Sequence, residues 1–391
     1  MSDTSFLNWP FLDDRHRALA IDIDAWSSAN MQRLTEHEEE DLDGTCRDIV
    51  KALGNAGFLH HAVSLGEGPG GKLDVRSLCL LRETLGRHHA LADFAFAMQG
   101  LGSGPISLFG SPQQQSQFLP AVASGDALAA FALSEPEAGS DVRAMTTQAE
   151  ERADHFIING EKTWISNAGL ANFYTVFART GESGGTKDIC CFIVQADNPG
   201  LRVSKRIELI APHPIGTLVF ENCIVPRENL VGSIGSGLGI AMATLDVFRT
   251  TVAAAALGMA RRALDETLSH VARRKVFGGV LSDLQLVQGK LSDMAVGIDS
   301  SALLVYRSAW TKDCLAQRVT REAAMAKLHA TESAQQVIDA AVQLHGGMGV
   351  TKGHIIESLY RDVRALRIYE GASEVQQTII ARQTLAGHIK P

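Results

Sequence analysis

The 391-residue sequence predicts an α+β multidomain fold, with an N-terminal all-α domain, a middle antiparallel β-barrel or sandwich, and a C-terminal four-helix bundle. Two observations carry this prediction. Apolar residues follow helical spacing up to about residue 125 and again after residue 237, whereas apolar and polar residues alternate between residues 131 and 231. We therefore expect domain boundaries at 1–127, 128–231 and 232–391.

The N-terminal domain is predicted from apolar spacing and from a helix cap. Apolar residues lie three or four positions apart in 43–55, and a long helix is expected over 74–99. Ser111-Pro112 caps a short helix that runs to Ala123, because proline suits the first helical position. Gly66 to Gly71 satisfies GxGxxG literally, but Pro69 interrupts it and no helix starts inside it, so a loop is favoured over a dinucleotide-binding fingerprint.

The middle domain is predicted from short alternating strands without helices between them. Turn residues separate the strands at Asn159-Gly160, Gly184-Gly185 and Asn198-Pro199-Gly200. The expected strands are 155–160, 162–166, 173–178, 189–195, 201–207 and 217–224.

The C-terminal domain is predicted from four long segments of helical character, whose lengths suit an antiparallel bundle. They run over about 238–272, 282–312, 320–345 and 353–385, and the last is expected to break near Glu370.

Composition narrows the functional classes. A net charge of −8 argues against a general nucleic-acid binder. The six cysteines show no CxxC spacing and the thirteen histidines form no HExxH motif, so no metal site is expected. The N-terminus has no signal-peptide pattern, and the longest apolar run, 252–257, is too short for a bilayer. We expect a cytoplasmic protein without a membrane span, although a chain already trimmed of a leader would look the same.

Glu370 is the candidate catalytic residue. Ile368 and Tyr369 are expected to wall off water on one side of it, and Gly371 permits close approach to the backbone. A poorly solvated glutamate has a raised pKa and can act as a base near neutral pH. The alternative is an ordinary helix start, with Ser373 as the cap and Glu374 in the first turn.

Two long strings identify a family resemblance. Leu133-Ser134-Glu135-Pro136-Glu137-Ala138-Gly139-Ser140-Asp141 and Tyr369-Glu370-Gly371-Ala372-Ser373, the latter followed by Ile380-Ala381-Arg382, resemble the two signatures of the acyl-CoA dehydrogenase family. The resemblance covers nearly the whole chain. It implies bound FAD, oxidation of a fatty acyl-CoA thioester to the 2,3-enoyl form, an electron-transferring flavoprotein as acceptor, and a homotetramer built as a dimer of dimers.

The resemblance also implies roles for individual residues. Glu370 is the implied base, and Ser140, Asp246, Arg249, Tyr369 and Gly371 are implied on the substrate side. Arg274 and the 343–347 loop are implied to reach the FAD of a neighbouring subunit. The implied cofactor-binding residues are Phe131, Ala132, Leu133, Ser134, Gly139, Trp164, Ile165, Ser166, Arg274, Phe277, Leu284, Gln285, Gln343, Leu344, His345, Gly346, Gly347, Ala372, Ser373 and Glu374.

Several of these residues also have a purely structural explanation. Glu135-Pro136 would be a turn, Trp164 a buried strand aromatic, Arg249 a solvated arginine on a helix surface, and the 343–347 segment a glycine C-cap.

The chain departs from the family pattern at several positions, which leaves the acyl group open. Glu137 replaces a common glycine, Ala372 a threonine and His345 an apolar residue or glycine, and 210–216 lacks a usual Met-Gly-x-Arg stretch. Some members carry the base on the first bundle helix, where this chain has Phe248. Rival functions are a flavin oxidase or monooxygenase on the same fold, and a helical scaffold without cofactor.

Overall fold

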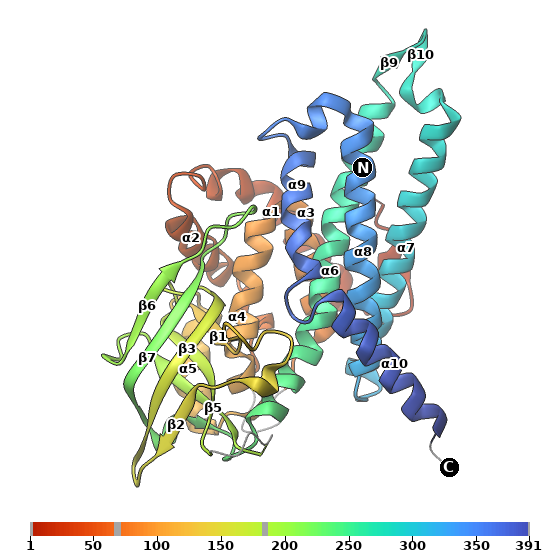
Figure 1. Cartoon of the computed structure of the whole chain (residues 1–391). Coiled ribbons are helices and arrows are strands. Elements are labelled where there is room, and N and C mark those ends of the chain that lie inside the picture. Colours follow the sequence, from red (N-terminus) through yellow and green to blue (C-terminus); the bar gives the residue numbers. More distant parts are fainter. Residues whose placement is uncertain (1–2, 66–71, 182–186, 390–391) are drawn as a thin grey trace. The chain divides into compact units, whose positions relative to one another are not determined.

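The computed structural model describes residues 3–65, 72–181 and 187–389 (Figure 1). The Gly66–Gly71 motif and the Gly184-Gly185 turn lie outside these residues. The chain forms two compact units. The bundle unit comprises Met1–Met31, Asp74–Asp93 and Asp246–Pro391, and the sheet unit comprises Gln32–Leu73 and Phe94–Leu245. The predicted class is confirmed: N-terminal helices precede a β-rich segment, and a helical bundle follows it.

The sheet unit is built on one main sheet in the order β6-β7-β3-β2-β4-β5-β8, with β1 added beside β4. Most pairs are antiparallel, but β1 and β2 each pair with β4 in parallel. Buried aromatic rings fill its core, for example Phe156 and Phe192 with centroids 4.9 Å apart. The strands are β1 Ala129–Ala132, β2 Gln148–Glu151, β3 His155–Ser166, β4 Phe173–Arg179, β5 Ile189–Gln195, β6 Leu201–Arg206, β7 Ile215–Pro226 and β8 Leu230–Val231.

The expected turn at Asn159-Gly160 is wrong, because both residues lie inside the continuous strand β3. The β3–β7 register slips between Ile158 and Gly160, so the Asn-Gly pair produces a bulge and not a reversal. Asn159 uses its side-chain Oδ1 to accept the backbone N–H of Asn222 at 2.7 Å.

The single helix expected over 74–99 is also wrong. His89 has extended backbone angles (φ −160°, ψ 128°) and separates α3 (Val75–His88) from α4 (Ala90–Phe109). The cap at Ser111 is confirmed as a full capping box with Gln114, opening α5 (Pro112–Ala123). Gly102 on α4 lets the helix approach β1, since a Cβ there would lie 2.5 Å from the backbone nitrogen of Ala130.

The bundle unit is centred on α8, which contacts α7, α9 and α10. Figure 1 shows a short hairpin, β9 and β10, projecting from one end of this bundle. The break predicted near Glu370 is confirmed, since residues 368–372 separate a 3₁₀ turn, Ala365–Arg367, from α10. The remaining α-helices and strands are α1 Asp14–Leu34, α2 Leu42–Asn55, α6 Gly237–Val271, α7 Gln285–Cys314, α8 Thr320–His345, α9 Ile355–Arg364, α10 Ser373–Ile389, β9 Lys275–Val276 and β10 Gly279–Val280.

One helix among the described residues, α6, is long and apolar enough to cross a membrane. The relevant stretch is 89% buried inside the protein, as in the core helix of a water-soluble fold.

Candidate active site

Glu370 lies in an unusual backbone turn between the 3₁₀ turn and α10. Its φ is +52° and that of Gly371 is +92°, so two successive residues adopt the left-handed region. A glutamate in this region is strained, and such residues persist only where their surroundings hold them. The φ of Gly371 favours glycine because L side chains rarely adopt it, and a Cβ there would also lie 2.4 Å from the side-chain nitrogen of Gln376, which would have to move.

Three side chains from three helices hold the carbonyl groups of this turn. Arg249 on α6 donates from Nε to the Glu370 carbonyl at 3.3 Å, and Lys327 on α8 donates from Nζ to the Gly371 carbonyl at 2.8 Å. Gln376 on α10 donates to both carbonyls, at 3.3 and 2.8 Å respectively. The turn is therefore fixed by the bundle and not by its local sequence.

Glu370 is half-buried, but one of its carboxylate oxygens, Oε2, is buried and lacks a hydrogen-bond partner among the described residues. Burial raises the pKa of Glu370, while the nearby positive charges of Arg82, Lys327 and Arg249 oppose that rise. Arg82 is itself fully buried and held by Asp93 through two 2.8 Å hydrogen bonds. An unpaired carboxylate with a raised pKa is suited to accept a proton from a bound molecule.

The flanking residues differ from expectation in one respect. Ile368 was expected to exclude water, but its side chain is 59% exposed, so that prediction is wrong. Tyr369 is half-buried, and burial raises its pKa. The Ser373 hydroxyl donates to Glu332 Oε1 at 2.5 Å, and Glu332 also pairs with Arg367 at 2.7 Å.

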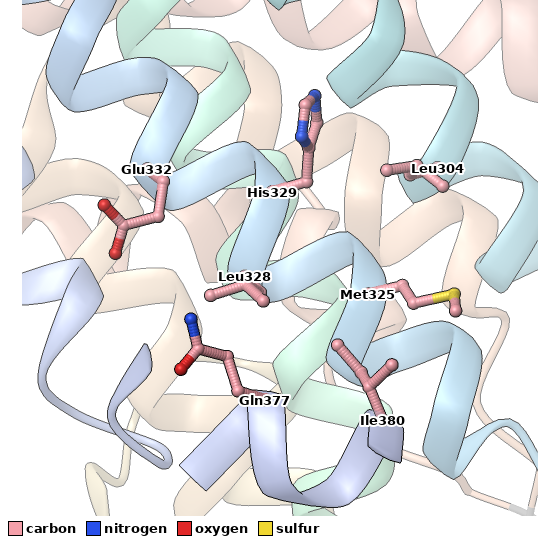
Figure 2. Close-up of a pocket in the computed structure, with 7 residues that line it drawn as sticks. All are labelled: Leu304, Met325, Leu328, His329, Glu332, Gln377 and Ile380. Carbon is pink, nitrogen blue, oxygen red and sulfur yellow. The ribbon is translucent and has the colours of Figure 1, made fainter. Parts of the chain in front are cut away.

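An apolar depression of about 380 Å³ lies between α7, α8 and α10, close to this start of α10 (Figure 2). Figure 2 shows Glu332 and Gln377 as its polar wall and Leu328 between them. The other lining residues are Leu304, Met325, His329 and Ile380. Since Lys327, the residue on α8 that contacts the turn, is absent from this lining, the depression is distinct from the Glu370 contacts.

Asp246 and Arg249, both predicted on the substrate side, form a buried pair. Arg249 Nη1 donates to Asp246 Oδ1 at 3.0 Å, and Asp246 Oδ2 accepts from the Thr320 hydroxyl at 2.6 Å. The alternative of a solvated arginine on a helix surface is therefore wrong. Phe248, at the other position where the family can carry its base, is 1% exposed. Glu370 is therefore the available carboxylate of the two family positions.

The predicted flavin segment of the sheet unit runs from Phe131 to Ser140. The backbone carbonyls of Leu133 and Ser134 are already used, by Lys162 Nζ at 3.1 Å and by the Thr163 N–H at 3.0 Å. The half-buried Ser134 adds a hydroxyl that a ligand could contact in this segment. Phe131 packs on Phe177 and Ala132 is buried, whereas Gly139 and Ser140 are exposed.

Glu135 anchors the same segment from inside the sheet unit. It accepts hydrogen bonds from Thr146, Thr147 and Lys162, and the Lys162 ammonium helps to hold the pKa of Glu135 at about 2, against the opposing effect of burial. Backbone bonds between Glu135 and Ala138 also form the turn that the local sequence suggested. Sequence reasoning gave Glu135 and Lys162 no such role.

Trp164 presents an open aromatic face. It has φ +60°, lies where the β3–β7 register slips between Lys162 and Ile165, and is 57% exposed. The alternative of an ordinary buried strand aromatic is therefore wrong. Ile165 is 1% exposed and Ser166, which ends β3, is half-buried. An exposed indole beside a hydroxyl suits a planar, polar-edged ring.

The other predicted cofactor residues of the bundle unit lie just beyond the C-terminal end of α6, at the start of α7 and at the C-terminal end of α8. His345 stacks on His270 of α6 with ring centroids 4.4 Å apart, and Nδ1 of His345 bonds the Ala341 carbonyl. Lys327 and His345 are 18 positions apart on α8, so their Cα atoms lie about 27 Å apart. These residues therefore form a group separate from Glu370; they comprise Arg274, Phe277, Leu284, Gln285, Gln343, Leu344, His345, Gly346 and Gly347.

The third predicted group, Ala372, Ser373 and Glu374, opens α10 directly after the Glu370 turn. Among the described residues, no group of three or more histidine, cysteine, aspartate or glutamate side chains is arranged to hold a metal ion.

Comparison with known proteins gives consistent results over most of the chain. The acyl-CoA dehydrogenase N-terminal, middle and C-terminal domain families match residues 13–126, 130–223 and 235–385. The chain is 40% identical to the mitochondrial short-chain specific acyl-CoA dehydrogenase of Mus musculus over 342 residues, which are 87% of this chain and 82% of the relative. It is 38% identical to a 3-(aryl)acrylate reductase of Clostridium sporogenes over 343 residues, 87% and 90% of the two chains.

A solved structure agrees with these relatives. The acyl-CoA dehydrogenase of Bacillus anthracis, described as complexed with FAD, superimposes with a TM-score of 0.86 at 28% identity, covering 100% of this chain and 71% of that one. The three matched domains and the 40% identical relative show that this chain belongs to the acyl-CoA dehydrogenase family.

Proposed function

We propose that this protein is an FAD-dependent acyl-CoA dehydrogenase in which Glu370 removes the α proton of an acyl-CoA thioester to give the 2,3-enoyl-CoA. The observation that carries the proposal is the buried Oε2 of Glu370, which lacks a partner among the described residues in a turn held by three helices. The α C–H beside a thioester is weakly acidic, so its removal needs a fixed base of matched pKa.

The residues of the sheet unit fit a flavin. The exposed Trp164 offers a face for the isoalloxazine ring, and the Ser134 and Ser166 hydroxyls offer polar contacts. Gly139 adds open space, since no atom of the described residues beyond its chain neighbours lies within 4 Å of a Cβ placed there. FAD, when bound, supplies the acceptor for the β hydride. The residues of this chain bind the two molecules, fix the thioester and hold the α proton at Glu370.

The active assembly is proposed to be a homotetramer. Large apolar side chains are exposed near the hairpin end of the bundle unit: Phe277 is 92%, Leu286 86% and Val350 70% exposed. Exposed apolar residues that gather in this way mark interaction sites. Arg274 and the 343–347 loop lie at the same end, which supports the idea that they contact FAD bound mainly by a partner subunit.

Replacing Arg274 with alanine is therefore expected to yield a paler protein. A guanidinium–phosphate contact contributes about 1.5–3 kcal/mol, so its loss should weaken FAD binding roughly tenfold or more. FAD content per subunit should be measured after dilution to low protein concentration. Arg15→Ala, which removes an exposed arginine of α1 in the bundle unit, is the control. Full FAD retention in Arg274→Ala would remove Arg274 from the cofactor site.

The proposed reaction is tested by the bleaching of flavin absorbance under a panel of substrates. Short-chain, branched and aryl-substituted acyl-CoAs should be compared, because the two curated relatives differ in the substrates that their names give. Aryl acrylates should be added to the reduced protein to test the reverse direction. Bleaching by at least one acyl-CoA is expected; a protein that binds FAD but is bleached by none of them would overturn the proposal.

The pH dependence of bleaching should identify the base. Because burial raises the pKa of Glu370, the fraction of reactive carboxylate grows as pH rises through that pKa. The rate of flavin reduction is therefore expected to increase with pH along a single ionisation above the ordinary glutamate value of 4.5. A rate independent of pH from 5 to 8 would contradict this assignment.

The electron acceptor and compartment follow as further proposals. We expect an electron-transferring flavoprotein to reoxidise the protein; slow reoxidation by air would favour this over an oxidase or monooxygenase. All six cysteines are free thiols, which supports a reducing, cytoplasmic location.

A further inference from the structure

Lys327 is a lysine buried inside the bundle unit whose side-chain partner is not a carboxylate. Its exposed fraction is 0%, and its Nζ donates to the backbone carbonyl of Gly371 at 2.8 Å. Burying an ammonium group is costly unless it is well partnered, and lysines are seldom fully buried. The α8 face around it is lined by small residues, among them Ala323, Ala324 and Ala330. Lys327 is therefore a buried cation on a helix face that otherwise carries small residues.

The bond from Lys327 falls on the strained part of the candidate site. Glu370 and Gly371 both have positive φ, and the Gly371 carbonyl is shared by Lys327 and Gln376. A carbonyl that receives a charge-assisted hydrogen bond is held more firmly than one bonded to a neutral donor. The Gly371 carbonyl belongs to the planar peptide group between Gly371 and Ala372, so holding it fixes the turn one residue after Glu370, while Arg249 and Gln376 hold the Glu370 carbonyl itself.

We propose that Lys327 is a positioning residue for Glu370, whose ammonium group holds the left-handed turn that carries this residue through the Gly371 carbonyl. The inference rests on the proposed function, because it assigns Lys327 to the base of that reaction. It differs from a purely structural role in one respect: the charge of Lys327, and not only its bulk, should matter to Glu370.

The charges that face Glu370 come from four helices. Arg82 on α3, Lys327 on α8 and Arg249 on α6 lower its pKa, whereas burial and Asp93 on α4 raise it. Burial lowers the pKa of Lys327 to about 8, with Glu370 opposing that change. Near neutral pH Lys327 is thus mostly charged, and removing it takes one of three cations from Glu370.

The test compares Lys327→Met, Lys327→Gln and Lys327→Arg in the FAD-loaded protein. Methionine removes the donor and the charge, glutamine keeps a neutral donor, and arginine keeps both. We expect methionine to slow flavin reduction at pH 7 by about tenfold or more, the scale of a lost hydrogen bond from a charged group. Its rate–pH profile should shift to higher pH. Glutamine should show the same shift with a smaller loss, and arginine should recover the wild-type profile.

A second readout needs no substrate. Hydrogen exchange of backbone amides in peptides that cover residues 366–373 should speed up in Lys327→Met, because the turn loses one of its donors. Lys312→Met, at the partly exposed end of α7, is the matched control and should change neither readout.

The outcomes distinguish failure of the proposed function from failure of the role proposed for Lys327. If no acyl-CoA bleaches the wild-type flavin, the proposed function fails, and unchanged exchange in Lys327→Met would then overturn the contact as well. If wild type is bleached but Lys327→Met and Lys327→Gln keep the wild-type pH profile, Lys327 does not act on the base. Should Lys327→Met not fold, the glutamine variant decides the question alone.

Discussion

Glu370→Gln is expected to slow flavin reduction by ~10²–10⁴, the usual contribution of a positioned general base. Glutamine has nearly the same shape but cannot take a proton from the thioester α carbon. The bonds from Arg249, Lys327 and Gln376 reach backbone carbonyls of the turn and not the side chain, so the turn should survive. FAD content and acyl-CoA binding should therefore stay close to wild type. Single-turnover bleaching by the best substrate is the measurement.

The stability of the same variant supplies an independent check. Because the pKa of Glu370 is raised in the folded chain, the folded state binds this proton more tightly than the unfolded state. The free energy of unfolding contributed by Glu370 therefore falls as pH rises from the ordinary value of 4.5 through the folded pKa. Glutamine does not titrate, so Glu370→Gln does not lose stability in this way. The melting temperature of the variant minus that of wild type should therefore increase from pH 5 to pH 8.

Glu322→Gln provides the matched control, since Glu322 is a carboxylate in the first turn of α8. It should alter neither the rate nor the pH dependence of stability. A Glu370→Gln protein that bleaches within about tenfold of wild type, less than a general base contributes, would show that another group removes the proton.

The regular parts of the fold follow from residue periodicity. The expected 189–195 and 320–345 segments agree with β5 and α8 at both ends, because each has a clear period and a defined stop. Local rules failed where tertiary pairing decided the outcome. Asn159-Gly160 is a strong turn signal in isolation, yet pairing of β3 with β7 keeps it extended. The break at His89 carries no glycine or proline to announce it.

In the candidate site, too, some residues could be predicted from a local motif and others depend on tertiary packing. Glu370 and Gly371 could be found from a short motif, whereas the residues that fix them come from distant helices. Arg82 and Lys327 lie near the turn because α3 and α8 pack beside it, and no spacing in the sequence relates them to Glu370; Gln376, six positions after Glu370, is the local exception. One signal was available: a lysine within an alanine-rich helical face is costly to bury without a purpose. The alanine-rich sequence around Lys327 therefore marks this residue as a candidate.

Arg82→Met is expected to produce the largest loss of stability, about 3–5 kcal/mol in the free energy of unfolding. Arg82 is 2% exposed and Asp93 3%, and two 2.8 Å hydrogen bonds join them. Removing the guanidinium would leave the Asp93 carboxylate buried without its partner. Denaturant unfolding at pH 7 measures the loss, and the exposed pair Arg202–Glu221 gives the control, since Arg202→Met should cost less than about 1 kcal/mol.

The double variant Arg82→Met, Asp93→Leu separates the stability of the fold from the chemistry of the site. Replacing both partners of a buried pair by apolar residues is often neutral, so most of the lost stability should return. The base should not recover fully, because Arg82 is the foremost of the charges that lower the pKa of Glu370, ahead of the opposing effect of Asp93. The rate–pH profile of flavin reduction in the double variant should therefore remain shifted to higher pH. A stable double variant with the wild-type profile would show that Arg82 supports only the packing of the bundle and leaves Glu370 to the influence of Lys327 and Arg249.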